Sequence, residues 1–270
     1  MPKFASRALL LIQRALWYLL DLGKDAMTPP RRLMNVGSNS LTRSDFHAIG
    51  REQMGFLVRV GGLKPDDNVL DVGCGVGRMA IQLAGYLSPE GSYRGFDIVR
   101  PSVDHCRQAI TPRFPNFQFH HADVQNSNYN PGGTIPPHDF RFPYADGSFS
   151  FVFLTSVFTH MQWSEVEQYM GEIQRVLGQG GRALATYFLI NPESESAIRG
   201  GRTRYTFAYP RDRGRVEVAD DPDAAVAFDE ALVRNLYADN GLDIVDTRYG
   251  AWSGRQTGVG FQDIIVARKR

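Results

Sequence analysis

A glycine-rich turn between a strand-like segment and a helical segment constrains this chain more than any other feature. The run reads Asp71-Val72-Gly73-Cys74-Gly75-Val76-Gly77. It follows the apolar residues 68–70 and leads into residues 78–84, whose apolar side chains recur at helical spacing. Glycines at such a turn let a ligand approach the backbone near the partial positive charge of a helix N-terminus. The sequence therefore predicts a strand–loop–helix unit that binds a small ligand.

Further strand-like segments follow the loop in order, and acidic side chains end two of them. Residues 93–97 end on Asp97, about 20 residues after the loop, where α/β nucleotide sites place a ribose-binding carboxylate. Asp123 follows residues 117–121, and a buried-type strand at 149–154 leads towards His160. The Gly-x-Gly-x-Gly spacing is one residue shorter than the Gly-x-Gly-x-x-Gly dinucleotide fingerprint. A nicotinamide-dependent oxidoreductase is therefore the less favoured alternative.

In this order the motifs resemble those of the class I S-adenosylmethionine-dependent methyltransferases, over roughly residues 63–189. The resemblance implies S-adenosylmethionine (SAM) as the cofactor. The cofactor-binding residues that it implies are Asp71, Gly73, Cys74, Gly75, Gly77, Asp97, Ile98, Asp123 and Val124. The three glycines would pass close to the methionyl part of SAM, with Cys74 as a small residue packed beneath it.

The other roles come from the matching motif positions. Asp71 would hold the cofactor ammonium, and Asp97 would accept both hydroxyls of the ribose diol. Ile98 would lie against the adenine face. Asp123 would accept from the adenine amino group, and the Val124 amide would serve a ring nitrogen. The alternative for the two carboxylates at 97 and 123 is a turn residue at the end of a strand.

His160 is the first candidate for a catalytic base, because it lies just past the fourth strand, where this family meets its acceptor. An imidazole with a pKa of roughly 6.5 suits proton removal from a hydroxyl. The alternative is a histidine that caps a helix or packs in the core. The weaker candidates are His47, His120, His121 and His138.

Two signatures of related families are missing. The chain lacks the D/N-P-P-Y/F motif of amino-methylating DNA enzymes, and the strand-end Asp with paired Asp-Asn of metal-dependent catechol methyltransferases. The resemblance therefore implies metal-independent methyl transfer to a small molecule, with a hydroxyl oxygen as the first choice. Nitrogen, sulfur or carboxylate acceptors remain open, as does a noncatalytic SAM-binding protein associated with a membrane.

Alternating strand and helix patterns predict an α/β fold with a parallel sheet covered on both faces. The expected strands are 68–71, 93–97, 117–121, 149–154, 181–189, 243–249 and 261–268. The expected helices are 44–60, 78–87, 103–110, 163–176 and 228–240. The resemblance adds a Rossmann-like, doubly wound sheet of seven mostly parallel strands whose last strand is antiparallel.

Two long loops and an N-terminal segment are additional to what a minimal SAM-binding domain requires. We expect residues 1–62 to form a helical extension or cap and residues 63–270 the SAM-binding domain. Residues 125–143 and 191–227 are expected lids, because both follow strand ends where ligands bind in open α/β sheets. The second insertion carries strand-like segments at 204–209 and 216–218, which predict a hairpin cover. Aromatic and arginine side chains in this region, among them Tyr205 and Arg204, could suit an aromatic, sugar-linked or acidic acceptor or serve ordinary packing.

Composition restricts the partners. A formal net charge of +1 gives no electrostatic case for nucleic acid. Two cysteines give no disulfide framework, so a cytoplasmic location is expected. Residues 8–24 have an amphipathic pattern with Arg14 inside it, too short in each apolar half to span a bilayer. This segment is expected to pack on the domain or on another subunit, or to lie on a membrane surface.

Overall fold

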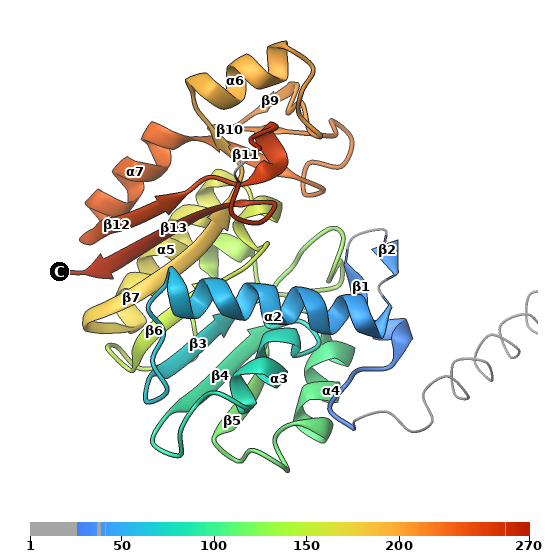
Figure 1. Ribbon diagram of the computed structural model, residues 1–270, viewed down its shortest axis with the longest axis vertical. Coiled ribbons are helices and arrows are strands. Elements are labelled where there is room, and N and C mark those ends of the chain that lie inside the picture. The colour runs from blue at the N-terminus through green and yellow to red at the C-terminus, as the bar shows by residue number, and fades with distance from the viewer. Residues whose placement is uncertain (1–25, 37–38, 41, 257) are drawn as a thin grey trace, which may run out of the picture.

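A seven-stranded sheet forms the centre of the molecule (Figure 1). The computed structural model describes residues 26–36, 39–40, 42–256 and 258–270. The strands of the central sheet are β3 (Asn68–Val72), β4 (Ser92–Asp97), β5 (Phe117–His121), β6 (Phe149–Leu154), β7 (Leu177–Tyr187), β12 (Leu242–Arg248) and β13 (Asp263–Lys269). Their order is β12-β13-β7-β6-β3-β4-β5.

The strand directions agree with the expected fold. Strands β5, β4, β3, β6 and β7 pair in parallel, whereas β13 lies between β7 and β12 and is antiparallel to both. The predicted Rossmann-like sheet with an antiparallel last strand is confirmed. Strand β7 begins at Leu177, before the expected residue 181, because Leu177 pairs with Phe149 ahead of an irregularity in the ladder. The carboxyl ends of the parallel strands therefore meet at one edge, where α/β proteins place their ligands.

Helices cover both faces of the sheet (Figure 1). The α-helices are α2 (Arg43–Arg59), α3 (Arg78–Ala84), α4 (Arg100–Ala109), α5 (Trp163–Val176), α6 (Pro192–Arg199) and α7 (Glu230–Asp239). The 3₁₀ helices are η1 (Arg31–Leu33), η2 (Pro137–Asp139), η3 (Phe158–His160) and η4 (Ala251–Ser253). Apolar side chains of α2, α3 and α4 pack on one face, and those of α5 and α7 pack on the other.

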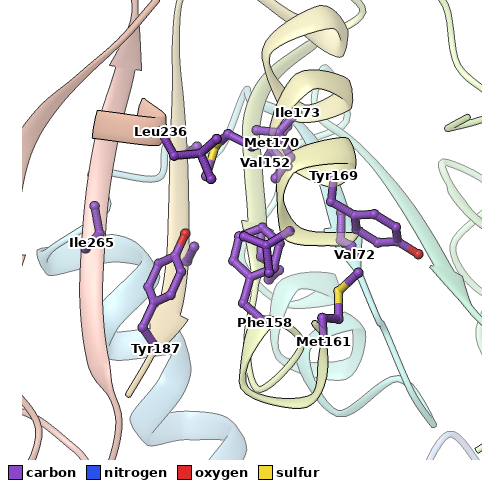
Figure 2. Packing of buried hydrophobic residues seen from close by; sticks show 14 of the residues in the cluster. Val72, Val152, Phe158, Met161, Tyr169, Met170, Ile173, Tyr187, Leu236 and Ile265 are labelled. Atoms are coloured by element: carbon purple, nitrogen blue, oxygen red, sulfur yellow. The ribbon is translucent and has the colours of Figure 1, made fainter. Parts of the chain in front are cut away.

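The core behind α5 and α7 is a continuous apolar layer. Figure 2 shows Met170 and Ile173 of α5 and Leu236 of α7 gathered around Val152 of the sheet. Val152 is fully buried, which is the setting of a strand covered on both faces. Burial of each such side chain contributes about 1.5–3 kcal/mol to folding.

The N-terminal part of the described chain packs directly on the domain. Helix α2 begins one residue before the expected start, because the Thr42 side chain accepts from the Asp45 N–H and Asp45 accepts from the Thr42 N–H. A side chain at Gly50 would approach Gln82 and Arg78 at 3.1–3.3 Å, so this glycine lets α2 lie close to α3. The expected amphipathic segment 8–24 lies outside the described residues. No helix in the described ranges is long and apolar enough to cross a membrane.

Residues 189–229, called the cover below, contain a separate small sheet and α6. Its strands are β8 (Leu189–Ile190), β9 (Tyr209–Arg211), β10 (Gly214–Val216) and β11 (Val226–Asp229), in the order β8-β11-β10-β9. The expected hairpin therefore forms, but at 209–216. The helix expected from residue 228 begins at 230, because residues 226–229 pair with β10 and β8. Asp229 caps that helix by accepting from the N–H groups of Ala231 and Leu232. A further two-stranded pair consists of β1 (Asn35–Val36) and β2 (Asn39–Ser40).

A buried carboxylate joins the cover to the main sheet. Asp263 accepts hydrogen bonds from the Leu189 N–H at 2.8 Å, the Gly250 N–H at 2.7 Å and the Trp252 Nε1–H at 2.7 Å. Burial raises its pKa to about 6 despite these donors. The indole of Trp252 also packs against Phe188 and Phe207, with ring centroids 5.4 Å apart in each pair. The cover is therefore fixed to the sheet at the edge where the strands end.

Candidate active site

A cavity of about 760 Å³ opens at the carboxyl ends of β3, β4, β6 and β7. The glycine loop and the end of β4 form one side of it. Helix α2 and η1 contribute a second side, and η3, the cover and residues 259–262 close the rest. The candidate site residues that line the cavity are Asp71, Gly73, Cys74, Gly75, Asp97, Ile98, Val124 and His160. Gly77 and Asp123 are absent from its lining.

The three loop glycines have different surroundings. All have a positive φ: +77° at Gly73, +52° at Gly75 and +79° at Gly77. A Cβ at Gly73 would lie 2.5 Å from Val157, and one at Gly77 would lie 2.7 Å from Ile110. A Cβ at Gly75 would meet no atom within 4 Å. Packing thus requires glycine at 73 and 77, whereas Gly75 faces open space in which a ligand can approach the backbone.

Backbone amides hold Asp97 at the end of β4. One carboxylate oxygen accepts the Gly75 N–H at 2.7 Å, and the other accepts the Val99 N–H at 2.8 Å. The side chain is buried, and desolvation raises its pKa against these amide hydrogen bonds. Each carboxylate oxygen can accept more than one hydrogen bond, so Asp97 retains capacity for a pair of ligand hydroxyls.

Asp71 is a second buried carboxyl in the cavity wall. It accepts a hydrogen bond of 2.7 Å from the Tyr93 hydroxyl, and burial raises its pKa to about 7. Burial also lowers the pKa of Arg78, which Asp71 opposes through its charge. Both Arg78 and Gln53 line the cavity, and among the described residues no group hydrogen-bonds to Arg78 Nε or Gln53 Oε1. This end of the cavity therefore has a cation and an amide with unused hydrogen-bonding capacity.

Asp123 lies beside the cavity and points elsewhere. Thr134 donates to one of its oxygens at 2.7 Å and Asn130 to the other at 3.3 Å, which lowers the pKa of the carboxyl. The following residue, Val124, is buried and does line the cavity. The hydrogen bonds at Asp123 thus fix the turn that carries Val124.

Cys74 is buried in the loop, and desolvation raises its thiol pKa well above the ordinary value. A protonated, buried thiol is a poor nucleophile. The structure therefore agrees with a packing role. Among the described residues, no cluster of three or more His, Cys, Asp or Glu side chains is arranged to hold a metal ion.

Long-range contacts hold His160 at the end of η3. Its Nδ1 lies 2.8 Å from the backbone oxygen of Asp223 in the cover, and its ring meets that of Tyr129 edge-on at 5.9 Å. A carbonyl oxygen can only accept, so Nδ1 carries the proton in the neutral ring and Nε2 keeps its lone pair. Of the histidines in the described ranges, only His160 lines the cavity.

Asp223 also joins the two expected lids. Its carboxylate accepts from the Ser127 hydroxyl at 2.6 Å and from the Gln162 amide at 3.1 Å. Nearby, the Asn128 amide donates to Asp221 at 2.8 Å. Residues from 125–143 and from 191–227 therefore meet next to His160.

Several cavity residues could not be singled out from the sequence. Ser156 has a φ of +57°, held by its N–H donating to Thr186 and its hydroxyl donating to Gln262. Positive φ at a non-glycine residue is uncommon and concentrates at functional sites. The remaining missed residues are Gln53 and Arg78, whereas Tyr129 and Arg204 lie in the expected lids. Only Arg78 had a sequence signal, namely its place at the first helical position after the glycine loop.

The chain is similar to known methyltransferases in part of its sequence and in its fold. Residues 70–185 match the family model described as "Methyltransferase domain". A solved SAM-dependent methyltransferase from Methanosarcina mazei shares 21% identity with a TM-score of 0.54, covering 78% of this chain and 96% of that one. Magnesium protoporphyrin IX methyltransferase from Synechocystis PCC 6803, with bound S-adenosylhomocysteine, shares 19% identity with a TM-score of 0.53, covering 89% and 92%.

A third structure is 1,6-didemethyltoxoflavin-N1-methyltransferase from Burkholderia thailandensis, with bound substrate and S-adenosylhomocysteine. It shares 15% identity with a TM-score of 0.52, covering 83% of this chain and 79% of that one. At these identities the likeness to solved structures shows the fold, and the family match over residues 70–185 adds the type of domain. Residues 70–185 therefore match a methyltransferase domain, and the chain has the fold of solved SAM-dependent methyltransferases.

Proposed function

We propose that this chain transfers the methyl group of SAM to a hydroxyl oxygen of a small-molecule acceptor, with His160 as the base. The observation that carries the proposal is the hydrogen bond between His160 Nδ1 and the Asp223 backbone oxygen. It leaves Nε2 free to accept a proton in the same cavity that contains Asp97 and the glycine loop.

The cavity offers suitable groups for the ribose and the adenine. Asp97 would accept the two ribose hydroxyls, while its hydrogen bonds to Gly75 and Val99 hold it in place. Ile98 and Val124 line the same cavity and would contact the adenine. We assign Asp123 a positioning role, since it is absent from the cavity lining and its hydrogen bonds to Thr134 and Asn130 hold the turn that carries Val124.

The amino acid end of the cofactor carries one carboxylate and one ammonium. Arg78 would bind the carboxylate, because its guanidinium lines the cavity with Nε unpaired among the described residues. Asp71 and the Gln53 side-chain oxygen would accept from the ammonium. Gly75 would give room for this part of the ligand, as a Cβ there meets open space.

Bound SAM supplies an electrophilic methyl group on a positively charged sulfur. His160 Nε2 would take the proton of the acceptor hydroxyl while that oxygen forms a bond to the methyl carbon. The electron pair of the breaking S–C bond stays on sulfur, which gives a methyl ether and S-adenosylhomocysteine. General base catalysis of this kind typically accelerates a reaction by about 10²–10⁴-fold. The reaction needs no metal ion in this scheme.

The chain segments around the cavity would exclude water from it. We assign residues 1–62 as an N-terminal cap, because Gln53, Phe56 and Leu57 of α2 line the cavity. Residues 125–143 and 191–227 would act as lids on the acceptor, since they meet at Asp223. Desolvation and alignment of the acceptor would then add to the base catalysis.

The first test is calorimetric titration of the purified chain with SAM and with S-adenosylhomocysteine. Asp97→Ala should weaken binding by at least about 30-fold. It removes the hydrogen bonds from the ribose to a carboxylate, each of which is worth about 1.5–3 kcal/mol. Asp66→Ala is the matched control, since Asp66 is exposed at the opposite ends of the strands. A folded chain that binds neither ligand would refute the proposal.

The second test uses SAM with a labelled methyl group and paired hydroxyl and amine acceptors. His160→Ala should abolish nearly all transfer to hydroxyls, because an alcohol needs a base. An amine already has a free lone pair, so its methylation should depend less on His160. Transfer that goes only to amines, or that is unaffected by His160→Ala, would contradict the assignment of an oxygen acceptor.

A further inference from the structure

Arg204 lies in the cover, lines the cavity and contacts two aromatic rings. Its guanidinium carbon is 5.6 Å from the centre of the Tyr205 ring and 5.5 Å from the centre of the Phe261 ring. Contacts with ring faces use the plane of the guanidinium and leave its N–H groups at the edge. The rings therefore restrict the cation without using its hydrogen-bond donors.

A second stacked arginine in the same molecule shows what completes this arrangement. Arg255 lies 4.4 Å from the centre of the Tyr249 ring and also donates to a carboxylate oxygen of Glu193 at 2.9 Å. No ion pair to Arg204 is found among the described residues. Arg204 thus has aromatic partners, as Arg255 does, but lacks a carboxylate partner among the described residues.

None of the acids that line the cavity forms an ion pair with Arg204 among the described residues. Asp71 accepts from Tyr93, and Asp97 accepts from two backbone amides. Glu165 accepts from the Gln162 N–H at 2.8 Å, as part of the cap of α5. The cavity therefore presents to a ligand an exposed cation, Arg204, that has no carboxylate partner among the described residues.

We propose that the methyl acceptor carries an anionic group, a carboxylate or a phosphate, and that Arg204 binds it. This inference rests on the proposed function, since it describes the acceptor of the same site. The planar guanidinium can bind either anion through two N–H groups at once, which would orient the acceptor relative to His160. The rings of Tyr205, Phe261 and Phe188 at this end of the cavity suit an acceptor with an apolar or aromatic body.

The test is calorimetry with three small probes, benzoate, phenyl phosphate and neutral benzamide, on the full chain with and without saturating S-adenosylhomocysteine. At least one anion should bind about tenfold or more tightly than benzamide, and Arg204→Gln should remove that advantage. Arg204→Lys keeps the charge but loses the planar fork, so it should restore only part of the affinity. Arg211→Gln is the matched control, because it makes the same charge change at an exposed residue outside the cavity lining.

The two anionic probes distinguish a carboxylate from a phosphate as the preferred group. The proposal is overturned if neither anion binds more tightly than benzamide, or if Arg204→Gln binds the anions as well as the unmodified chain does. Failure of S-adenosylhomocysteine to bind would instead refute the proposed function. The titrations without that ligand still decide the role of Arg204, so the two failures can be told apart.

Discussion

The two sides of the cavity are built in different ways. On the cofactor side, formed by the glycine loop and the end of β4, backbone amides hold the acidic side chain. Gly75 and Val99 donate to Asp97 at 2.7 and 2.8 Å. On the acceptor side, formed by η3, residues 125–143 and the cover, side chains from separate loops hold one another. The Asp223 carboxylate accepts from the Ser127 hydroxyl, and its backbone oxygen accepts from His160 Nδ1.

This difference separates a rigid half from an adjustable half. Backbone donors at the end of a buried strand move only if the sheet moves, so they suit a ligand of fixed shape. Contacts between loops that are partly exposed cost less to break, because water can replace them. A constant cofactor and a variable acceptor would be served by such a division.

The largest expected effect is on the free energy of unfolding and concerns the buried carboxyl of Asp71. It would show how much stability the ligand-free cofactor side loses by burying this carboxyl. Burial raises the pKa of Asp71 from the ordinary 3.8 to about 7. Between these values the folded chain keeps a proton that the unfolded chain has released, so the free energy of unfolding falls as pH rises. Asp71→Asn keeps the shape of the side chain but cannot release a proton, so the free energy of unfolding of the variant does not fall in this way as pH rises. Above pH 7 the ligand-free variant should be more stable by up to roughly 4 kcal/mol.

Urea unfolding of both chains at a series of pH values from 4 to 8 measures this difference. Asp123→Asn provides a contrast of opposite sign, because hydrogen bonds from Thr134 and Asn130 lower the pKa of Asp123. Its stabilising contribution is present above the ordinary pKa and is lost as pH falls through the folded value. If the free energy of unfolding depends on pH in the same way for Asp71→Asn and the unmodified chain, then burial does not raise the pKa of Asp71.

The next expected effect separates two glycines of the cofactor side. Gly77→Ala places a Cβ 2.7 Å from Ile110 and 2.9 Å from Cys106, at a φ of +79°. Steric overlap and left-handed backbone strain together should lower the free energy of unfolding by about 3 kcal/mol. A Cβ at Gly75 would meet no atom within 4 Å. Gly75→Ala should therefore lower the free energy of unfolding by only about 1–2 kcal/mol, the cost of a left-handed backbone conformation at alanine.

The same pair should differ in the reverse sense in ligand affinity. Gly75 lines the cavity and Gly77 does not, so at temperatures where both variants are folded, Gly75→Ala should weaken SAM binding more. Urea unfolding and calorimetry on the two variants measure both quantities. Equal losses of stability, or a larger loss of affinity at Gly77, would mean that the two glycines share one role.

The cofactor side could be predicted from the sequence because its contacts are local in the fold. Gly75 lies in the loop after β3, and Asp97, 22 residues later, ends the neighbouring strand β4, so the motif order brings them together. The alternation of strands and helices predicted an α/β fold, and the resemblance to the methyltransferases predicted the seven-stranded sheet. Arg78 and Gln53 were missed, because only the packing of α2 on α3 shows that both reach the cavity.

The acceptor side could be predicted only in part. His160 was singled out because it follows β6, but its partner Asp223 is 63 residues away, and Ser127 is 96 residues from Asp223. No local pattern connects such positions. Residues 226–228 form a short apolar run that fits either a strand or a buried helix, and pairing with β10 decides for the strand. Asp229 was an available helix-start signal that would have placed the boundary correctly.

The smallest expected effect tests whether the loop contacts at Asp223 matter for catalysis. Asp223→Ala removes the carboxylate that Ser127 and Gln162 bind, so the backbone oxygen that fixes His160 Nδ1 should lose its anchorage. We expect kcat towards a hydroxyl acceptor to fall about tenfold, less than on removal of the base itself. Nitrogen NMR of the imidazole should show a mixture of tautomers in place of the Nδ1-protonated form. Asp221→Ala is the matched control, because Asp221 binds Asn128 and does not contact His160. If Asp223→Ala keeps both the tautomer and kcat, then the acceptor side positions its base through η3 alone, and the contrast between the two sides is smaller than the contacts suggest.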